Sequence, residues 1–250
     1  MIEKLQEIVQ RLRAADGCPW DRQQTPESIK NYILEEAYEV ADAVENKSPP
    51  QVAEELGDLL FMAVFLANLY MEKHCFSLDD VLQGAKDKMI RRHPHVFGEQ
   101  RLESSEEVRE NWEKIKQRER ADKTLASALE AVPRTLPALM RTHRVLAKFR
   151  RALHRPLGRE LLAQELAEAV AAITASTTHE SSSPAKLLGK ALFLAVALHL
   201  EAKIKAEEAL SKTVSGFSKR IGQLEVKLQE SGRTWQDFSE KEEKDLWHSL

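Results

Sequence analysis

The stretch "ILEEAYEVADAVE", from Ile33 to Glu45, decides the fold because its apolar residues recur at the spacing of a helix with one buried stripe. Glu36 interrupts this pattern, since it projects into the apolar arc, and Glu39 lies at the edge of the same arc. Removing an unpaired carboxylate from water costs several kcal/mol, so these acids predict a cation, a hydrogen-bond donor or a bound proton beside them. The stripe consists of Ile29, Ile33, Ala37, Val40 and Val44.

The remainder of the chain supports an all-α fold. Its 250 residues are enough for one large domain or two small ones, each with a real core. The nine glycines and nine prolines mostly separate long periodic stretches. Runs rich in Val, Ile and Thr with period-two alternation are absent, which excludes an extensive sheet.

Charge and cysteine content narrow the class of protein. The 37 basic and 40 acidic residues leave a net charge of -3, so no global charge favours nucleic acid or a membrane surface. The chain starts with the amphipathic "MIEKLQEIVQRLR", without an apolar signal core, and no stretch approaches the about 20 apolar residues of a membrane span. We therefore expect a cytoplasmic protein. Cys18 and Cys75 are too few for a disulfide framework or a zinc cluster, so both are predicted to be free thiols.

Start and stop signals divide the chain into helices. "TPES", from Thr25, supplies an N-cap and a proline at the first helical position, and "NKSPP" ends that helix. A second helix follows from Gln51 and is apolar on every side after Asp58, which predicts burial in a bundle or across a subunit interface. Ser77 caps a third helix, "HPHVFGEQ" is expected to be a loop, and "SSEEVRENWEKIKQRER" is expected to be a further helix.

The second half of the chain repeats part of the first. The segment from Glu54 to Val64 aligns without gaps on the segment from Lys186 to Val196, with six of eleven positions identical. "EEAYEVA", from Glu35, similarly matches "QELAEAV", from Gln164. We predict two related helical modules, over residues 1–121 and 122–250, with a flexible loop over residues 176–184.

Two acidic pairs should converge in the first module. Glu36 and Glu39 stand three residues apart on one helix, as do Glu55 and Asp58 on the next, and the short loop makes these helices antiparallel neighbours. One isolated pair would ordinarily be a solvated helix face, but two facing pairs predict a carboxylate pocket. A ligand set made only of oxygen suits Mg²⁺ or Mn²⁺, and no Glu-x-x-His pair is present to support a di-iron site.

The second module has lost half of this pocket. Leu187 and Lys190 occupy the positions of Glu55 and Asp58, whereas Glu165 and Glu168 persist. The change removes two negative charges and adds a positive one. We therefore expect an ion pair from Lys190 to one of the two glutamates, and no metal site.

Four blocks together resemble the signature of MazG-type nucleoside triphosphate pyrophosphohydrolases. These blocks are "GCPWDRQQT", "EEAYE", "EELGD" and "RRHPHVFG", and the resemblance is close over roughly residues 5–120. It implies an all-α, usually dimeric enzyme that cleaves a nucleoside triphosphate to the monophosphate and pyrophosphate with Mg²⁺. By motif match, the metal ligands are Glu36, Glu39, Glu55 and Asp58, and either Glu35 or Glu39 is the general base.

The same resemblance suggests substrate-binding residues. Lys88 and Arg92 are four apart on one helix, as are Trp112 and Lys116 on another, and both pairs resemble positions that hold phosphates and nucleotide in the family. Their plainer interpretation is a solvated face. Trp20 either stacks on a base or plugs the core. His93 and His95 flank Pro94 and either contact phosphate or form a structural turn.

Two alternatives to a general triphosphate pyrophosphohydrolase stay open. One is a narrower enzyme with the same metal site, such as a phosphoribosyl-ATP or deoxynucleotide pyrophosphohydrolase. The other is a non-catalytic helical regulatory or interaction protein whose metal site is vestigial. A scaffold has no need for four converging acids with basic residues nearby, which favours the enzyme.

Overall fold

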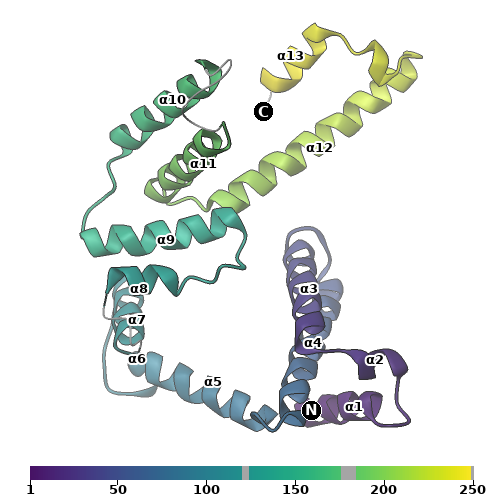
Figure 1. Ribbon diagram of the computed structural model, residues 1–250, viewed down its shortest axis with the longest axis vertical. Coiled ribbons are helices and arrows are strands. Elements are labelled where there is room, and N and C mark those ends of the chain that lie inside the picture. Colours follow the sequence, from purple (N-terminus) through teal and green to yellow (C-terminus); the bar gives the residue numbers. More distant parts are fainter. Residues whose placement is uncertain (120–123, 176–183, 249–250) are drawn as a thin grey trace. The chain divides into compact units, whose positions relative to one another are not determined.

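The computed structural model of the chain confirms the all-α class (Figure 1). It describes residues 1–119, 124–175 and 184–248, and no strand occurs in these ranges. The chain divides into two compact units, Met1–Arg120 and Ala121–Leu250. The prediction that the second unit is a diverged copy of the first stays a prediction.

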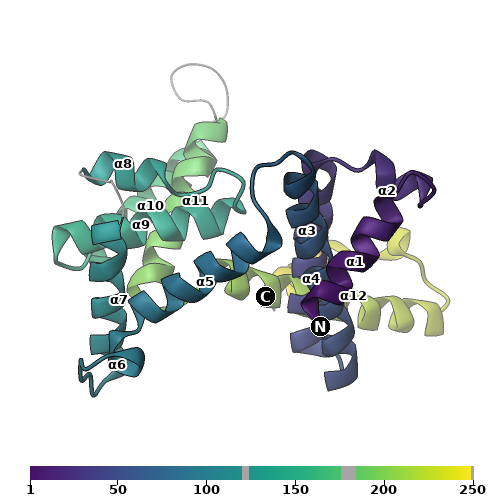
Figure 2. The same cartoon turned by 90° about the horizontal axis from the view of Figure 1, so that it is seen from below.

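The first unit is built around an antiparallel pair, α3 and α4. Both Figure 1 and Figure 2 show α1 and α2 beside this pair, and α5 to α7 follow it along the chain. The helices of this unit are α1 (Ile2–Arg13), α2 (Pro19–Gln23), α3 (Pro26–Asn46), α4 (Pro49–Glu72), α5 (Leu78–Arg92), α6 (Pro94–Phe97) and α7 (Ser105–Glu119).

The predicted helix starts are confirmed by their caps. The backbone N–H of Ser28 donates to Thr25 Oγ1 at 3.3 Å, and the backbone N–H of Thr25 donates to Ser28 Oγ at 3.0 Å. Ser77 and Asp80 form the same reciprocal cap at the start of α5. The second helix begins at Pro49, two residues earlier than Gln51, because proline lacks the N–H group that would be unpaired at a helix start.

The core of the first unit lies where α4 meets α1 and α3. Phe65 and Ile29 are among its largest fully buried side chains. Gln6 of α1 and Met71 of α4 also contact each other, with Nε2 at 3.4 Å from Sδ. The buried cluster contains Val9, Ile29, Val64, Phe65, Ala67, Leu69 and Leu78.

One sequence prediction for this unit was wrong in part, and another is confirmed only in part. The later half of α4 is buried, whereas Leu60 is 47% exposed and Leu56, before the predicted apolar stretch, is 50% exposed. Burial of this part of the helix across a subunit interface stays a prediction. "HPHVFGEQ" is not entirely a loop, since Pro94–Phe97 forms the single turn α6, which the proline starts.

The second unit contains a similar antiparallel pair, α10 and α11. Leu146 of α9 packs against α11, where it forms a buried cluster with Val196, Ala197 and Leu200. The predicted flexible loop over residues 176–184 lies, except for Pro184, outside the described residues. The helices are α8 (Leu125–Glu130), α9 (Ala138–Leu153), α10 (Arg159–Ala175), α11 (Pro184–Glu201), α12 (Ala206–Glu230), a 3₁₀ turn (Trp235–Asp237) and α13 (Glu240–His248).

Candidate functional site

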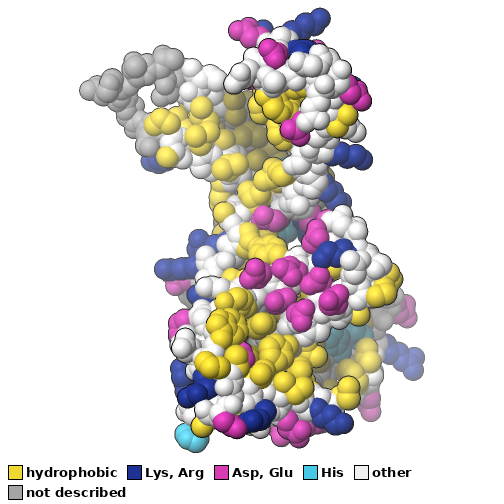
Figure 3. All heavy atoms as spheres, turned by 90° about the vertical axis from the view of Figure 1, so that its right-hand side faces the viewer, with side chains coloured by type: hydrophobic (Ala, Val, Ile, Leu, Met, Phe, Trp, Pro, Cys, Tyr) yellow, Lys and Arg dark blue, Asp and Glu magenta, His cyan; other side chains and the backbone are white. Residues whose placement is uncertain are grey.

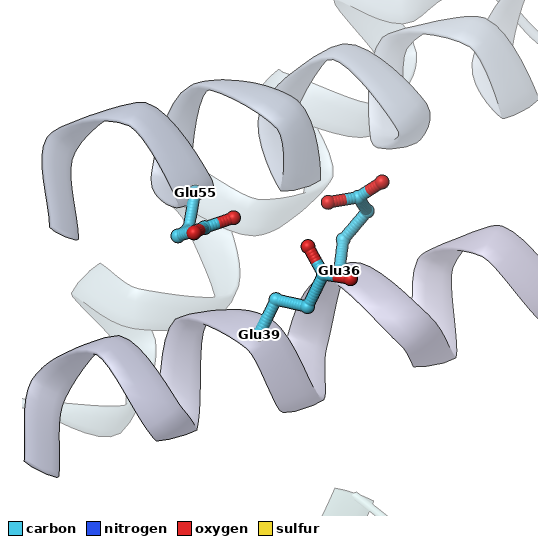
Figure 4. Close-up of side chains that lie close together, drawn as sticks. All are labelled: Glu36, Glu39 and Glu55. Carbon is cyan, nitrogen blue, oxygen red and sulfur yellow. The ribbon is translucent and has the colours of Figure 1, made fainter. Parts of the chain in front are cut away.

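Three predicted ligands meet between α3 and α4. Glu36 and Glu39 extend from α3 toward α4, and Glu55 extends from α4 into the same space (Figure 4). Each offers one carboxylate oxygen, and these oxygens all lie within 4.8 Å of one another. The i,i+3 spacing on α3 and the antiparallel neighbour produce this arrangement. Within the part of the chain that the structure describes, no second group of acids, histidines or cysteines is gathered as closely.

Burial and mutual repulsion disfavour the charged forms of these acids. Desolvation raises the pKa of the partly buried Glu36, and the charges of Glu39 and Asp58 raise it further. Desolvation also raises the pKa of Glu39, with the charge of Glu55 and a hydrogen bond between the two carboxyl groups acting in the same direction. The cluster therefore favours a bound proton or a cation.

Lys47 is a member of this site that the sequence patterns did not single out. Its Nζ donates to Glu55 Oε1 at 2.7 Å, and this contact raises the lysine pKa. The one available signal is its place in the short loop between the two acidic helices. A single ammonium group cannot balance three carboxylates, so the donor set still fits a divalent cation with oxygen ligands.

Asp58 and Glu35 lie at the margin of the group. Asp58 is exposed and is not one of the three acids within 4.8 Å, but its negative charge contributes to the raised pKa of Glu36. Glu35 is also exposed, and its negative charge contributes to the raised pKa values of both Glu36 and Glu39. Their predicted roles as metal ligand and general base stay predictions.

The predicted substrate residues of α5 and α7 form a separate basic and aromatic group. The guanidinium carbon of Arg92 lies 5.9 Å from the Trp112 ring centroid, and Lys116 Nζ lies 4.6 Å from it. Glu119 accepts from Arg92 Nη2 at 2.6 Å and also pairs with Arg91. The structure thus brings Arg92, Trp112 and Lys116 together, but does not join them to the three glutamates.

The neighbours of this group differ in their polar contacts. Lys88 is exposed on α5, one turn before Arg92. His93 Nδ1 lies 2.6 Å from the carbonyl oxygen of Met89, so His93 helps to end α5. His95 Nδ1 and Trp112 Nε1 are buried and have no hydrogen-bond partner among the described residues. Unpaired buried polar atoms are costly, so a polar ligand would find partners here.

Trp20 lies at the protein surface and does not fill the hydrophobic core. Its side chain is 50% exposed, and its ring meets the Tyr32 ring edge-on at 5.8 Å. Tyr32 lies one helical turn before Glu36 on α3. The core-plug alternative is therefore wrong.

The second unit holds an ion pair where the first holds its acidic cluster. Lys190 Nζ lies 2.7 Å from Glu165 Oε2, which confirms the predicted pair. Glu168 instead accepts from Gln164 Nε2 at 3.0 Å.

Two further observations concern the cysteines and the apolar helices. Cys18 and Cys75 are free thiols, as expected. None of the described helices combines the length and the apolar character needed to cross a membrane.

These features define an all-α protein with a carboxylate site suited to a divalent cation. A domain family described as "MazG nucleotide pyrophosphohydrolase domain" matches residues 24–97. The nucleoside triphosphate pyrophosphohydrolase of Escherichia coli (strain K12) is 38% identical over 228 residues, which cover 90% of this chain and 87% of the relative. The nucleoside triphosphate pyrophosphohydrolase/pyrophosphatase MazG of Thermotoga maritima is 32% identical over 254 residues, covering 99% and 94%. This chain therefore belongs to the MazG family, as its signature blocks predicted.

A solved structure, the mazG-related protein from Thermotoga maritima, also matches part of the chain. It is 30% identical, covers 46% of this chain and 98% of its own, and superposes with a TM-score of 0.40.

Proposed function

We propose that this chain is a nucleoside triphosphate pyrophosphohydrolase, which releases a nucleoside monophosphate and pyrophosphate. Membership of the MazG family supports this function, as do the printed names of the relatives from Escherichia coli and Thermotoga maritima. The observation that carries it is the convergence of Glu36, Glu39 and Glu55 within 4.8 Å. Carboxylates placed so closely have little structural benefit without a cation.

The cofactor in this proposal is Mg²⁺, for which Mn²⁺ can substitute. Glu36, Glu39 and Glu55 would hold the ion together with Asp58. The negative charge of Asp58 contributes to the raised pKa of Glu36, so Asp58 lies near the group. Mg²⁺ takes oxygen ligands, so carboxylates of this group together with waters and substrate phosphates would complete its coordination. When bound, it neutralises phosphate charge and makes a nearby water more acidic.

The remaining residues of the cluster handle protons and charge. We assign the general-base role to Glu35, because Glu39 belongs to the close group of three and Glu35 does not. Glu35 would then accept the proton of the attacking water. Lys47 keeps Glu55 paired in the absence of a cation, so cation binding has to compete with this contact.

The basic and aromatic group of α5 and α7 would bind the nucleotide. Arg92 offers a planar fork for phosphate oxygens, and Lys116 and Lys88 add positive charge. The buried Nε1 of Trp112 is a donor without a protein partner among the described residues. Trp20, half exposed beside α3, offers a ring face on which a base can stack.

We further propose that the protein is a homodimer. Leu34 and Tyr38 on α3, together with Leu56 and Leu60 on α4, are exposed apolar side chains of the unit that carries the acids. Figure 3 shows acidic side chains gathered next to a patch of hydrophobic ones on one face. Such a patch beside a polar site is typical of a subunit interface.

The test is hydrolysis of a panel of ribonucleoside and deoxyribonucleoside triphosphates with Mg²⁺, with separate detection of pyrophosphate and orthophosphate. We expect pyrophosphate and monophosphate in equal amounts, and loss of turnover when a chelator removes the metal. Orthophosphate and diphosphate as the main products would contradict the proposal. Activity on a single nucleotide class would instead identify one of the narrower enzymes.

A further inference from the structure

Arg13, the last residue of α1, joins three elements of the first unit. Its Nε donates to Glu72 Oε1 at 2.6 Å and its Nη2 to Glu72 Oε2 at 2.7 Å, which makes a bidentate pair with the end of α4. Its Nη1 donates to the carbonyl oxygens of Asp21 and Gln24, at the end of α2. The Arg13 side chain is only 12% exposed.

The surroundings of this pair are specific for arginine. The guanidinium carbon lies 5.6 Å from the Phe65 ring centroid, and Glu72 Oε1 also accepts from Asn68 Nδ2 at 2.8 Å. The planar Arg13 guanidinium donates four hydrogen bonds, two to carboxylate oxygens and two to carbonyl oxygens. A lysine ammonium keeps the charge but cannot reproduce the bidentate fork.

The segment that Arg13 holds carries Trp20. Gln24 Nε2 donates to the Trp20 carbonyl oxygen at 3.1 Å, and Ser28 Oγ donates to Gln24 Oε1 at 2.7 Å. The Trp20 ring meets Tyr32 of α3. The backbone is thus held from Trp20 to Gln24, while the half-exposed Trp20 ring contacts Tyr32, one turn before Glu36 on α3.

We propose that Arg13 is a positioning residue for nucleobase binding, which acts by fixing the Trp20 ring through the α2 backbone. The inference rests on the proposed function, in which a base stacks on Trp20. No base-edge donor or acceptor is needed for this contact, so it accepts purines and pyrimidines alike. The contacts that hold the Arg13 side chain are with protein groups, so its role is one of positioning.

The first test separates base binding from phosphate binding. In Arg13→Lys, the KM for a nucleoside triphosphate should rise roughly 10-fold, the size expected for loss of one stacking contact. The kcat and the inhibition constant of inorganic tripolyphosphate, which lacks a base, should stay unchanged. The matched control is Arg11→Lys on the same helix, since the Arg11 side chain pairs with the exposed Asp16. An equal loss of tripolyphosphate binding would overturn the inference.

The second test asks whether Arg13 acts through Trp20. Trp20→Ala should raise KM as much as Arg13→Lys, and the double variant should show no further increase. Additive effects would overturn the inference. If Arg13→Lys does not fold, Glu72→Gln weakens the pair that anchors the Arg13 guanidinium. It should raise KM in the same direction and leave tripolyphosphate inhibition unchanged, and an unchanged KM would overturn the inference.

A third readout is independent of activity. In protein labelled with 5-fluorotryptophan, the ¹⁹F resonance of Trp20, assigned with Trp20→Phe, should shift in Arg13→Lys and not in Arg11→Lys. An unchanged resonance would overturn the positioning role even if the protein hydrolyses no nucleotide. Inactive wild-type protein with the expected ¹⁹F shift would instead contradict only the proposed function.

Discussion

At the scale of single residues, substitution of Glu36 should lower turnover without lowering the folding stability of the metal-free protein. Glu36→Gln keeps the side-chain volume but removes one charge from the crowded group, so we expect turnover to fall by roughly 100-fold or more as a metal ligand is lost. The metal-free variant should melt at the same or a higher temperature than the wild type, because like-charge repulsion is relieved. Steady-state kinetics and thermal melts with a chelator test both expectations.

The control for this substitution lies in the second unit. Glu165 occupies the position of Glu36 in the sequence repeat, but its partner is Lys190 and the pair is largely exposed. Exposed pairs contribute about 0–1 kcal/mol, so Glu165→Gln should leave turnover and melting temperature nearly unchanged. If Glu165→Gln abolished activity and Glu36→Gln preserved it, the active site would lie in the other half of the chain.

The raised pKa values of Glu36 and Glu39 predict how pH affects the metal-free protein. Above the ordinary carboxylate value of 4.5, the folded state keeps protons that the unfolded state has released. Folding stability from this cluster therefore falls as pH rises from 4.5 through the raised pKa values, and then levels off. Melting temperatures should be measured with a chelator between about pH 5 and about pH 8. The melting temperature of Glu36→Gln minus that of the wild type should increase as pH rises. A constant difference would contradict this assignment.

At the scale of elements, the α10–α11 pair tests what a helix pair needs to bind a cation. Leu187→Glu together with Lys190→Asp would add two acids to Glu165 and Glu168, at the spacing of the first unit. In a Glu36→Gln background, this variant should bind Mn²⁺ in a calorimetric titration. It should not hydrolyse nucleotide, because the "CPWD" and "RRHPHVFG" blocks are missing from this unit. Lys190→Met, which frees Glu165 without adding a ligand, is the control and should bind no Mn²⁺.

Local sequence determined the helices well, since their signals are short-range. Thr25 and Ser77 predicted helix starts because a cap depends on residues three positions away, and i,i+3 spacing placed Glu36 and Glu39 on one face. Lys47 and Arg13 escaped prediction, because their partners lie across a loop or on another helix. The exposure of Leu60 depends on what packs against α4, which an apolar pattern cannot specify.

At the scale of the whole molecule, the exposed face of α3 and α4 predicts self-association. Light scattering at micromolar concentration should give twice the chain mass of 28.4 kDa. Leu60→Asp should shift the protein toward the monomer, since it puts a charge into an apolar interface. A wild-type monomer would contradict the homodimer and favour pairing of the two related modules within one chain.

The sequence repeat supplies a matched substitution for this experiment. Leu192 occupies the position of Leu60 in the second unit and is 59% exposed. If the interface is formed by α3 and α4, Leu192→Asp should leave the dimer intact while Leu60→Asp dissociates it. Dissociation by Leu192→Asp alone would place the interface on the second unit, and the apolar face beside the glutamates would then need another partner. Activity measured on the same samples shows whether the acidic site depends on the dimer, because a site completed by self-association loses turnover in parallel with dimer mass.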